Sequence, residues 1–147
     1  MAGIGGTPYL GAYTATKAAV VALSESWAGE LEENDIHVSV LCPAFVQTRI
    51  YESERNRPEK YQSDSAPKSE QGFFANSAKQ MVESGIDVSI VGNRVVEALN
   101  DKEFYIFTHP NYRSLIQERA AAIDEAFAKS EKSSLLKNIA DQKIEMP

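Results

Sequence analysis

The sequence of 147 residues contains one cysteine, two histidines and no long run of apolar residues. A single cysteine, Cys42, cannot form an intramolecular disulfide or a multi-cysteine metal site, which is compatible with a reducing compartment. No segment approaches the roughly eighteen apolar residues that a membrane-spanning helix needs. The N-terminus also lacks the basic and apolar regions of a signal peptide, so we expect a cytoplasmic protein with no membrane partner.

Basic side chains are in the minority, because 15 Lys and Arg face 21 Asp and Glu and the net charge is −6. Nucleic acids attract basic surfaces, so this balance argues against a nucleic-acid partner. His37 and His109 have no carboxylate at metal-ligand spacing, and we predict no metal site. With 43% hydrophobic and 24% charged residues, the chain has the composition of an ordinary globular protein.

A long helix followed by a buried strand is predicted in the first third of the chain. Small side chains at Ala18, Ala22 and Gly29 form one face of the helix, where another helix of the domain or of a second subunit can approach. The run Ile36–Cys42 predicts a strand covered on both faces, as in a parallel sheet. The other helix face repeats apolar residues at spacings of three and four: Ala12, Ala15, Ala19, Leu23, Trp27 and Leu31.

The stretch from Arg49 to Lys68 is polar, and excursions of this length are often lids or binding loops. A helix over Ser69–Ser84 follows, and we predict Gly85 as its C-cap. Together residues 49–84 are predicted to form a lid over the substrate.

Two further helices flank one further strand in the last third. Asp87 is predicted to cap a helix, and Phe104–Thr108 forms a short aromatic strand. A last helix covers Tyr112–Lys129, and residues 130–147 form a polar tail. The positions predicted to face inward are Val88, Val91, Val95 and Leu99 in the first helix and Leu115, Ile116, Ile123 and Phe127 in the second.

Tyr13 and Lys17 are the strongest candidates for chemistry. Their spacing of four residues places both side chains on one face of the long helix. A tyrosine hydroxyl, with a pKa of about 10, becomes useful for proton transfer when a nearby ammonium favours the phenolate. Alone, the pair is better explained as a solvated lysine beside a half-buried tyrosine, because a pair with this spacing is common by chance. Its context favours chemistry, because the strand after this helix ends in a proline turn with a hydroxyl, Pro43 to Thr48, where open α/β sheets bind ligands.

The strings GAYTATKAAVVALSESWAGEL and VSVLCPAFVQT resemble the classical branch of the short-chain dehydrogenase/reductase family. The resemblance implies that Tyr13 is the general acid/base and that Lys17 binds the ribose of NAD or NADP and tunes the tyrosine. It also implies that the turn formed by Pro43, Ala44, Phe45 and Val46 passes along the nicotinamide, and that Thr48 meets its carboxamide or phosphate side. Ala44 departs from the usual glycine and is tolerable only if its φ angle is negative. By their position just past Thr48, Arg49 and Tyr51 are candidates for substrate contact.

Several parts of the family pattern do not occur in this sequence. The catalytic serine would stand thirteen residues before Tyr13, immediately before Met1, and the glycine-rich pyrophosphate turn is not found either. We therefore expect an α/β fold with a Rossmann-like, doubly wound parallel sheet of which only the C-terminal portion is present, spanning residues 1–129.

The sequence thus predicts an oxidoreductase that interconverts an alcohol and a ketone with NAD or NADP. The family resemblance also implies a homotetramer or homodimer. Two alternatives stay open: an epimerase or dehydratase of the family's extended branch, and a chain that catalyses nothing and serves as an assembly half or an inactive fragment.

Overall fold

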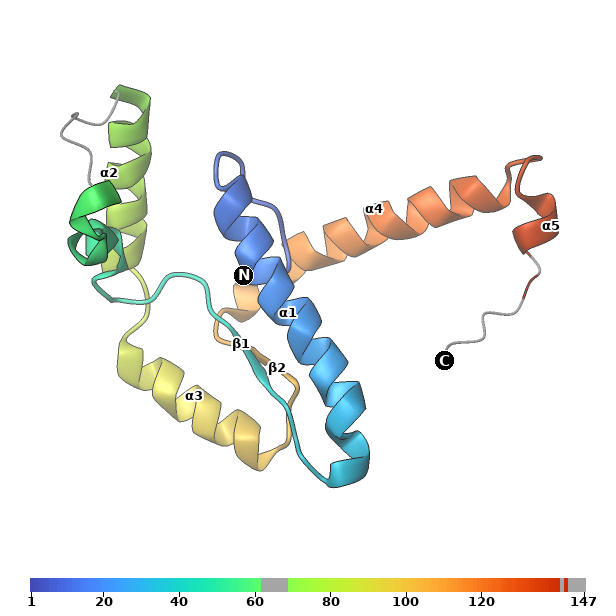
Figure 1. The fold of residues 1–147 in the computed structure, drawn as a ribbon, viewed down its shortest axis with the longest axis horizontal. Coiled ribbons are helices and arrows are strands. Elements are labelled where there is room, and N and C mark those ends of the chain that lie inside the picture. The colour runs from blue at the N-terminus through green and yellow to red at the C-terminus, as the bar shows by residue number, and fades with distance from the viewer. Residues whose placement is uncertain (62–68, 141, 143–147) are drawn as a thin grey trace. The chain divides into compact units, whose positions relative to one another are not determined.

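A computed structural model describes residues 1–61, 69–140 and 142. Its contacts divide the chain into two compact units, residues 1–109 and residues 110–147. The first unit contains α1 (Gly11–Leu31), β1 (Val40–Cys42), α2 (Ser69–Glu83), α3 (Val88–Asn100) and β2 (Tyr105–Phe107), and the second contains α4 (Arg113–Glu131) and α5 (Lys137–Ala140) (Figure 1). The predicted boundary after residue 129 stays a prediction. The segment 62–68 of the predicted lid and residues 141 and 143–147 of the predicted tail lie outside the described residues.

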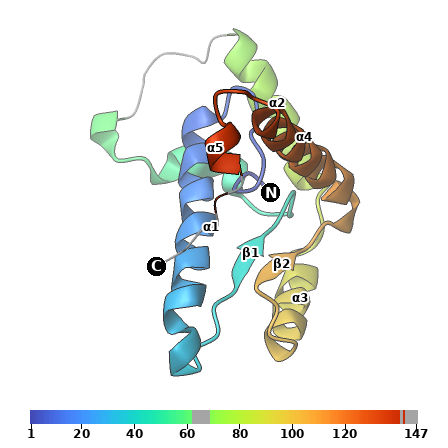
Figure 2. The same cartoon turned by 90° about the vertical axis from the view of Figure 1, so that its right-hand side faces the viewer.

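The two strands form a parallel pair, as the sequence predicts. Val40 lies opposite Tyr105, Leu41 opposite Ile106 and Cys42 opposite Phe107. Figure 2 shows α1 on one side of this pair and α3 on the other. The first unit therefore has three layers, helix, sheet and helix, which is the architecture expected of an α/β protein with a parallel sheet.

The core lies at this sheet, and its strands are covered unequally. Side chains alternate along a strand, so Val40 and Cys42 face one layer while Leu41 faces the other. Val40 and Cys42 are 5% and 4% exposed, but Leu41 is 42% exposed. The prediction that this strand is covered on both faces is therefore wrong for the described chain. On β2, Ile106 is 2% exposed and completes the core with the fully buried Ala98 of α3.

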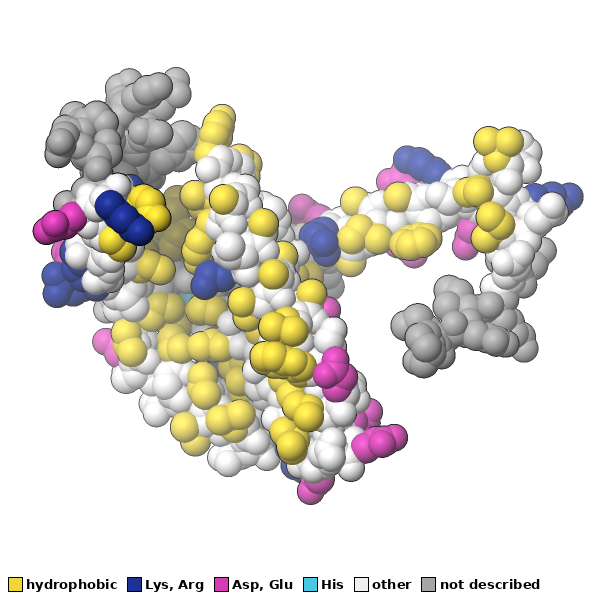
Figure 3. Space-filling model, viewed as in Figure 1, with side chains coloured by type: hydrophobic (Ala, Val, Ile, Leu, Met, Phe, Trp, Pro, Cys, Tyr) yellow, Lys and Arg dark blue, Asp and Glu magenta, His cyan; other side chains and the backbone are white. Residues whose placement is uncertain are grey.

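Helix α1 turns a different face inward from the one predicted. Its buried residue is Ser24, whose hydroxyl donates to the Val20 carbonyl at 2.8 Å, whereas Leu23 and Trp27 of the predicted apolar face are each 48% exposed. Figure 3 shows hydrophobic side chains gathered along this outer surface of α1. At the start of the helix Leu10 occupies the N-cap position and offers no side-chain hydrogen bond. The first-turn N–H groups of α1 are thus left without a capping side chain.

Helix α3 begins at the predicted cap, but the residue that it buries is not one of those predicted to face inward. The Asp87 carboxylate accepts the Ser89 backbone N–H at 2.7 Å, which confirms the cap. Val88 and Leu99 were predicted to face inward but are 54% and 52% exposed, and Ala98 takes the central place instead.

The second unit consists of α4 and α5. Of the four side chains of α4 predicted to face inward, Ile116 is half-buried, and Leu115, Ile123 and Phe127 are 55%, 42% and 69% exposed within the described residues. In the part of the chain that the structure describes, we find no helix with the length and apolar character needed to cross a membrane.

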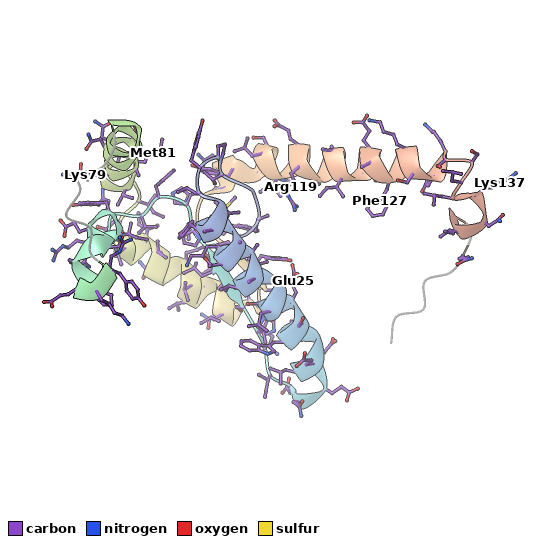
Figure 4. The ribbon with its side chains drawn as sticks, turned by 45° about the horizontal axis from the view of Figure 1, so that its top comes forward. Glu25, Lys79, Met81, Arg119, Phe127 and Lys137 are labelled. Atoms are coloured by element: carbon purple, nitrogen blue, oxygen red, sulfur yellow. The ribbon has the colours of Figure 1, made fainter. Side chains whose placement is uncertain are left out.

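One hydrogen bond joins α1 to the sheet. The Tyr105 hydroxyl donates to the carboxylate of Glu25, which projects from the middle of α1 (Figure 4). This hydrogen bond, with partial burial and the negative charge of Glu25, raises the pKa of Tyr105 to about 12. The contribution of the hydroxyl to stability is therefore complete below the unfolded-state pKa of about 10 and is lost as the pH rises through the folded-state value.

Replacing Tyr105 with phenylalanine should therefore destabilise the protein at neutral pH, and the destabilisation should become smaller at alkaline pH. We expect the difference in unfolding free energy between the wild type and Tyr105→Phe to fall between about pH 10 and about pH 12. Urea denaturation of both proteins at a series of pH values measures this difference. A difference that stays constant over the range would contradict the role assigned to the bond with Glu25.

Candidate active site

The predicted pair lies near the N-terminus of α1. The Lys17 ammonium nitrogen lies 5.4 Å from the centre of the Tyr13 ring, so the helical spacing does bring the two groups together. Tyr13 is 44% exposed, and its side chain is accessible to a small ligand. A positive charge at this distance interacts favourably with the aromatic ring.

The turn that follows β1 lies at the same end of the sheet as this pair. Helix α1 leads through a short connection directly into β1, so its first turn stands at the edge where β1 ends. Pro43, Ala44, Phe45 and Val46 are half-buried, and Thr48 is exposed. The Thr48 hydroxyl accepts the backbone N–H of Ile50 at 3.4 Å, which leaves its own proton available to a ligand. The carboxyl edge of a parallel sheet is where α/β proteins bind ligands.

Ala44 fits the turn despite its methyl group. Among the described residues the positive φ angles outside glycine belong to Tyr9, Asp35 and Lys102, so Ala44 has the negative angle that a side chain requires. Its backbone N–H donates to Nδ1 of His109 at 3.4 Å, and the Thr108 hydroxyl lies 2.7 Å from the same nitrogen. A residue from the end of β2 therefore contacts the turn, a role that the sequence did not indicate.

Gly85, at the junction between α2 and α3, also contacts this turn. It is predicted as the C-cap of the helix before it, and its backbone N–H does donate to the Val82 carbonyl at 3.1 Å near the end of α2, although its φ angle is not positive. Its backbone also approaches Phe45, and Val46 pairs with Ile86 in a parallel bridge. The reason for a glycine here is close packing against the turn.

Arg49 and Tyr51 lie beside the turn and contact neighbours of their own. The Arg49 guanidinium binds the Glu52 carboxylate at 2.6 Å, and Lys79 of α2 lies 5.4 Å from the centre of the Tyr51 ring. An open hollow of about 450 Å³ is lined by Gln47, Thr48, Arg49, Tyr51 and Glu83. The two candidate substrate residues thus border one concavity next to Thr48.

Cys42 lies in the core at the end of β1. Cys42 is 4% exposed, and burial raises the pKa of its thiol, so the thiolate is disfavoured. Within residues 1–61, 69–140 and 142 there is no group of three or more His, Cys, Asp or Glu side chains that could hold a metal ion.

Comparison with known proteins identifies the segment that carries this site. The model of the short chain dehydrogenase family matches residues 1–59, which include Tyr13, Lys17 and the turn after β1. Over residues 1–59 the chain is therefore similar to the short-chain dehydrogenase family.

Similarity to known proteins extends beyond that segment. The chain is 35% identical over 128 residues to the CLA biosynthesis dehydrogenase/reductase of Lactiplantibacillus plantarum, covering 84% of this chain and 45% of the relative. It is 28% identical over 131 residues to the C alpha-dehydrogenase of a Sphingobium species, covering 89% and 42%. The chain thus spans less than half the length of these relatives.

A solved structure extends the likeness to the fold. A short-chain dehydrogenase/reductase from Burkholderia phymatum, crystallised in complex with NAD, is 34% identical and superposes with a TM-score of 0.79 over 85% of this chain and 46% of its own. The match supports the predicted α/β fold with a parallel sheet, as part of a Rossmann-like domain.

Proposed function

We propose that the protein carrying this chain is an NAD- or NADP-dependent oxidoreductase that interconverts a secondary alcohol and a ketone. The observation that carries the proposal is the Tyr13–Lys17 pair, with 5.4 Å between ammonium nitrogen and ring centre, at the edge of a parallel sheet where β1 ends. Its relatives are dehydrogenases and reductases, and the Burkholderia enzyme was crystallised with NAD.

The residues at this edge fit the nicotinamide and ribose half of such a cofactor. Lys17 offers three N–H donors, and the hydroxyls of Tyr13 and Thr48 can both donate and accept. In this proposal Lys17 and Tyr13 hold the ribose, the half-buried backbone from Pro43 to Val46 passes along the nicotinamide, and Thr48 binds the carboxamide or phosphate side. These donors suit the hydroxyl groups of the ribose, the carboxamide of the nicotinamide and one negatively charged phosphate of the cofactor.

The side chains of this chain would then control the proton. When bound, the nicotinamide cofactor supplies the hydride chemistry. In the reduction, the Tyr13 hydroxyl donates its proton to the carbonyl oxygen of the ketone, and in the oxidation its phenolate accepts the proton of the alcohol. The Lys17 ammonium stabilises the phenolate that remains. Arg49 and Tyr51 border the hollow beside Thr48 and are the candidates for contact with the rest of the substrate.

The long helix suggests self-association as a second part of the proposal. The small side chains at Ala18, Ala22 and Gly29 form an exposed face of α1, and Leu23 and Trp27 on the other face are each 48% exposed. Small residues let two helices approach closely. We infer that the face formed by Ala18, Ala22 and Gly29 binds a second copy of the chain in a homodimer or homotetramer.

Two alternatives make different predictions for the same site. An epimerase or dehydratase of the extended branch shares the Tyr–Lys pair but releases no net reduced cofactor, while the turn from Pro43 to Thr48 favours a dehydrogenase. A chain that serves only in assembly would bind no cofactor.

Titration with NADH and NADPH, followed through the fluorescence of the cofactor, separates these possibilities. We expect saturable binding of one of the two by the full-length protein, and oxidation of the cofactor when ketones are added. Binding without ketone-dependent oxidation would favour the epimerase or dehydratase. Lack of saturable binding of both cofactors would reject the proposed function.

A further inference from the structure

Gly85 occupies a place where a side chain would collide with the neighbouring backbone. A Cβ atom added to it would lie 2.4 Å from the carbonyl oxygen of Phe45, 2.5 Å from its carbonyl carbon and 2.8 Å from the amide nitrogen of Val46. These three atoms belong to the backbone of the turn after β1, so they cannot move aside as the end of a flexible side chain can. A side chain at residue 85 therefore has to displace either the turn or the junction between α2 and α3.

Hydrogen bonds fix the turn to this junction on both sides of Gly85. The Gln47 backbone N–H donates to the Ile86 carbonyl at 2.9 Å, and the Ile86 N–H donates to the Phe45 carbonyl at 3.1 Å. The Gln47 side-chain amide donates to the Glu83 carbonyl at 3.3 Å, at the last residue of α2. The segment Phe45–Gln47 is thus held against the α2–α3 junction by a parallel bridge between Val46 and Ile86.

We propose that Gly85 is a positioning residue for the cofactor, acting through the turn rather than touching the cofactor itself. Its bare Cα lets the junction lie against Phe45, and the resulting bonds set the path of the backbone that carries Val46 and Thr48. This inference rests on the proposed function, since it assigns Gly85 to the same site. Loss of the contact weakens cofactor binding while the proton transfer at Tyr13, which is anchored in α1, is largely retained.

The substitution Gly85→Ala tests this role, and Gly92→Ala is its matched control. Gly92 lies within α3, and a Cβ atom added there meets no atom within 4 Å. We expect Gly85→Ala to raise the Kd and KM for the cofactor about tenfold, the effect of losing one or two hydrogen bonds of the turn, with kcat at saturating cofactor within about threefold of wild type. Gly92→Ala should leave all three constants unchanged. A cofactor Kd within about twofold of wild type in folded Gly85→Ala would overturn the proposal.

Amide hydrogen exchange in the wild type decides the question if Gly85→Ala does not fold. Saturating cofactor should slow exchange of the N–H groups of Gln47 and Ile86, because ligand binding selects the bridged turn. The N–H of Glu103, which donates to the Ala98 carbonyl at 2.9 Å before β2 begins, serves as the internal control. Unchanged exchange at Gln47 and Ile86 while the cofactor is bound would overturn the role of the junction. Failure of the wild type to bind any cofactor would instead reject the proposed function, so the two failures are distinguishable.

Discussion

Turnover by the Tyr13→Phe variant is expected to fall by about 10²–10⁴-fold, which is the contribution of a positioned general acid or base. The substitution removes one hydroxyl and keeps the ring that lies 5.4 Å from the Lys17 nitrogen, so the packing of the pair is preserved. Cofactor binding should change little, because most of its proposed contacts lie in the turn from Pro43 to Thr48. The loss should therefore appear in kcat.

Steady-state kinetics and a cofactor titration on the same preparation measure the two effects separately. Tyr105→Phe is the matched control, since it removes a tyrosine hydroxyl that bonds Glu25 and lies outside the proposed site. We expect its kcat to stay within about twofold of wild type at neutral pH. Retained turnover in Tyr13→Phe would reject Tyr13 as the acid/base.

The substitution Ile106→Ala is expected to destabilise the protein strongly. Ile106 is 2% exposed at the centre of the core, and truncating such a side chain costs about 2–5 kcal/mol through lost burial and the cavity left behind. This loss of unfolding free energy is a large share of the roughly 5–15 kcal/mol by which a typical domain is stable. Chemical denaturation followed by circular dichroism measures the change in the free energy of unfolding.

Leu41→Ala provides the control for that measurement. Leu41 lies opposite Ile106 in the parallel register but is 42% exposed. Its truncation should therefore cost well under the value for Ile106, about 1 kcal/mol or less. Equal losses for both variants would mean that Leu41 is covered in solution, for example by a second copy of the chain.

Features set by neighbouring residues could be predicted from the sequence. The helix that brings Tyr13 to Lys17 and the cap that Asp87 forms with Ser89 depend on contacts over a few residues. The parallel strand pair could be predicted because an α/β pattern with a buried apolar run has few alternatives.

Features set by distant residues could not be predicted in the same way. The contacts of the turn with Gly85 and with His109 join residues about 40 and 65 positions apart, and no local pattern signals them. The inward face of α1 was misassigned because this helix has alanine or another apolar residue on almost every side, so periodicity does not single out one face. For α4, apolar spacing predicted burial, but spacing alone does not supply a partner surface.

The uncapped start of α1 affects the electrostatics of the tyrosine. Tyr13 is the third residue of a helix whose N-cap, Leu10, provides no hydrogen-bond acceptor from its side chain. The peptide dipoles of an α-helix leave partial positive charge at such an end, which favours a nearby anion by about 0.3–1 kcal/mol. The first turn of α1 therefore carries partial positive charge of its own, close to the residue proposed as the acid/base and separate from the charge of Lys17.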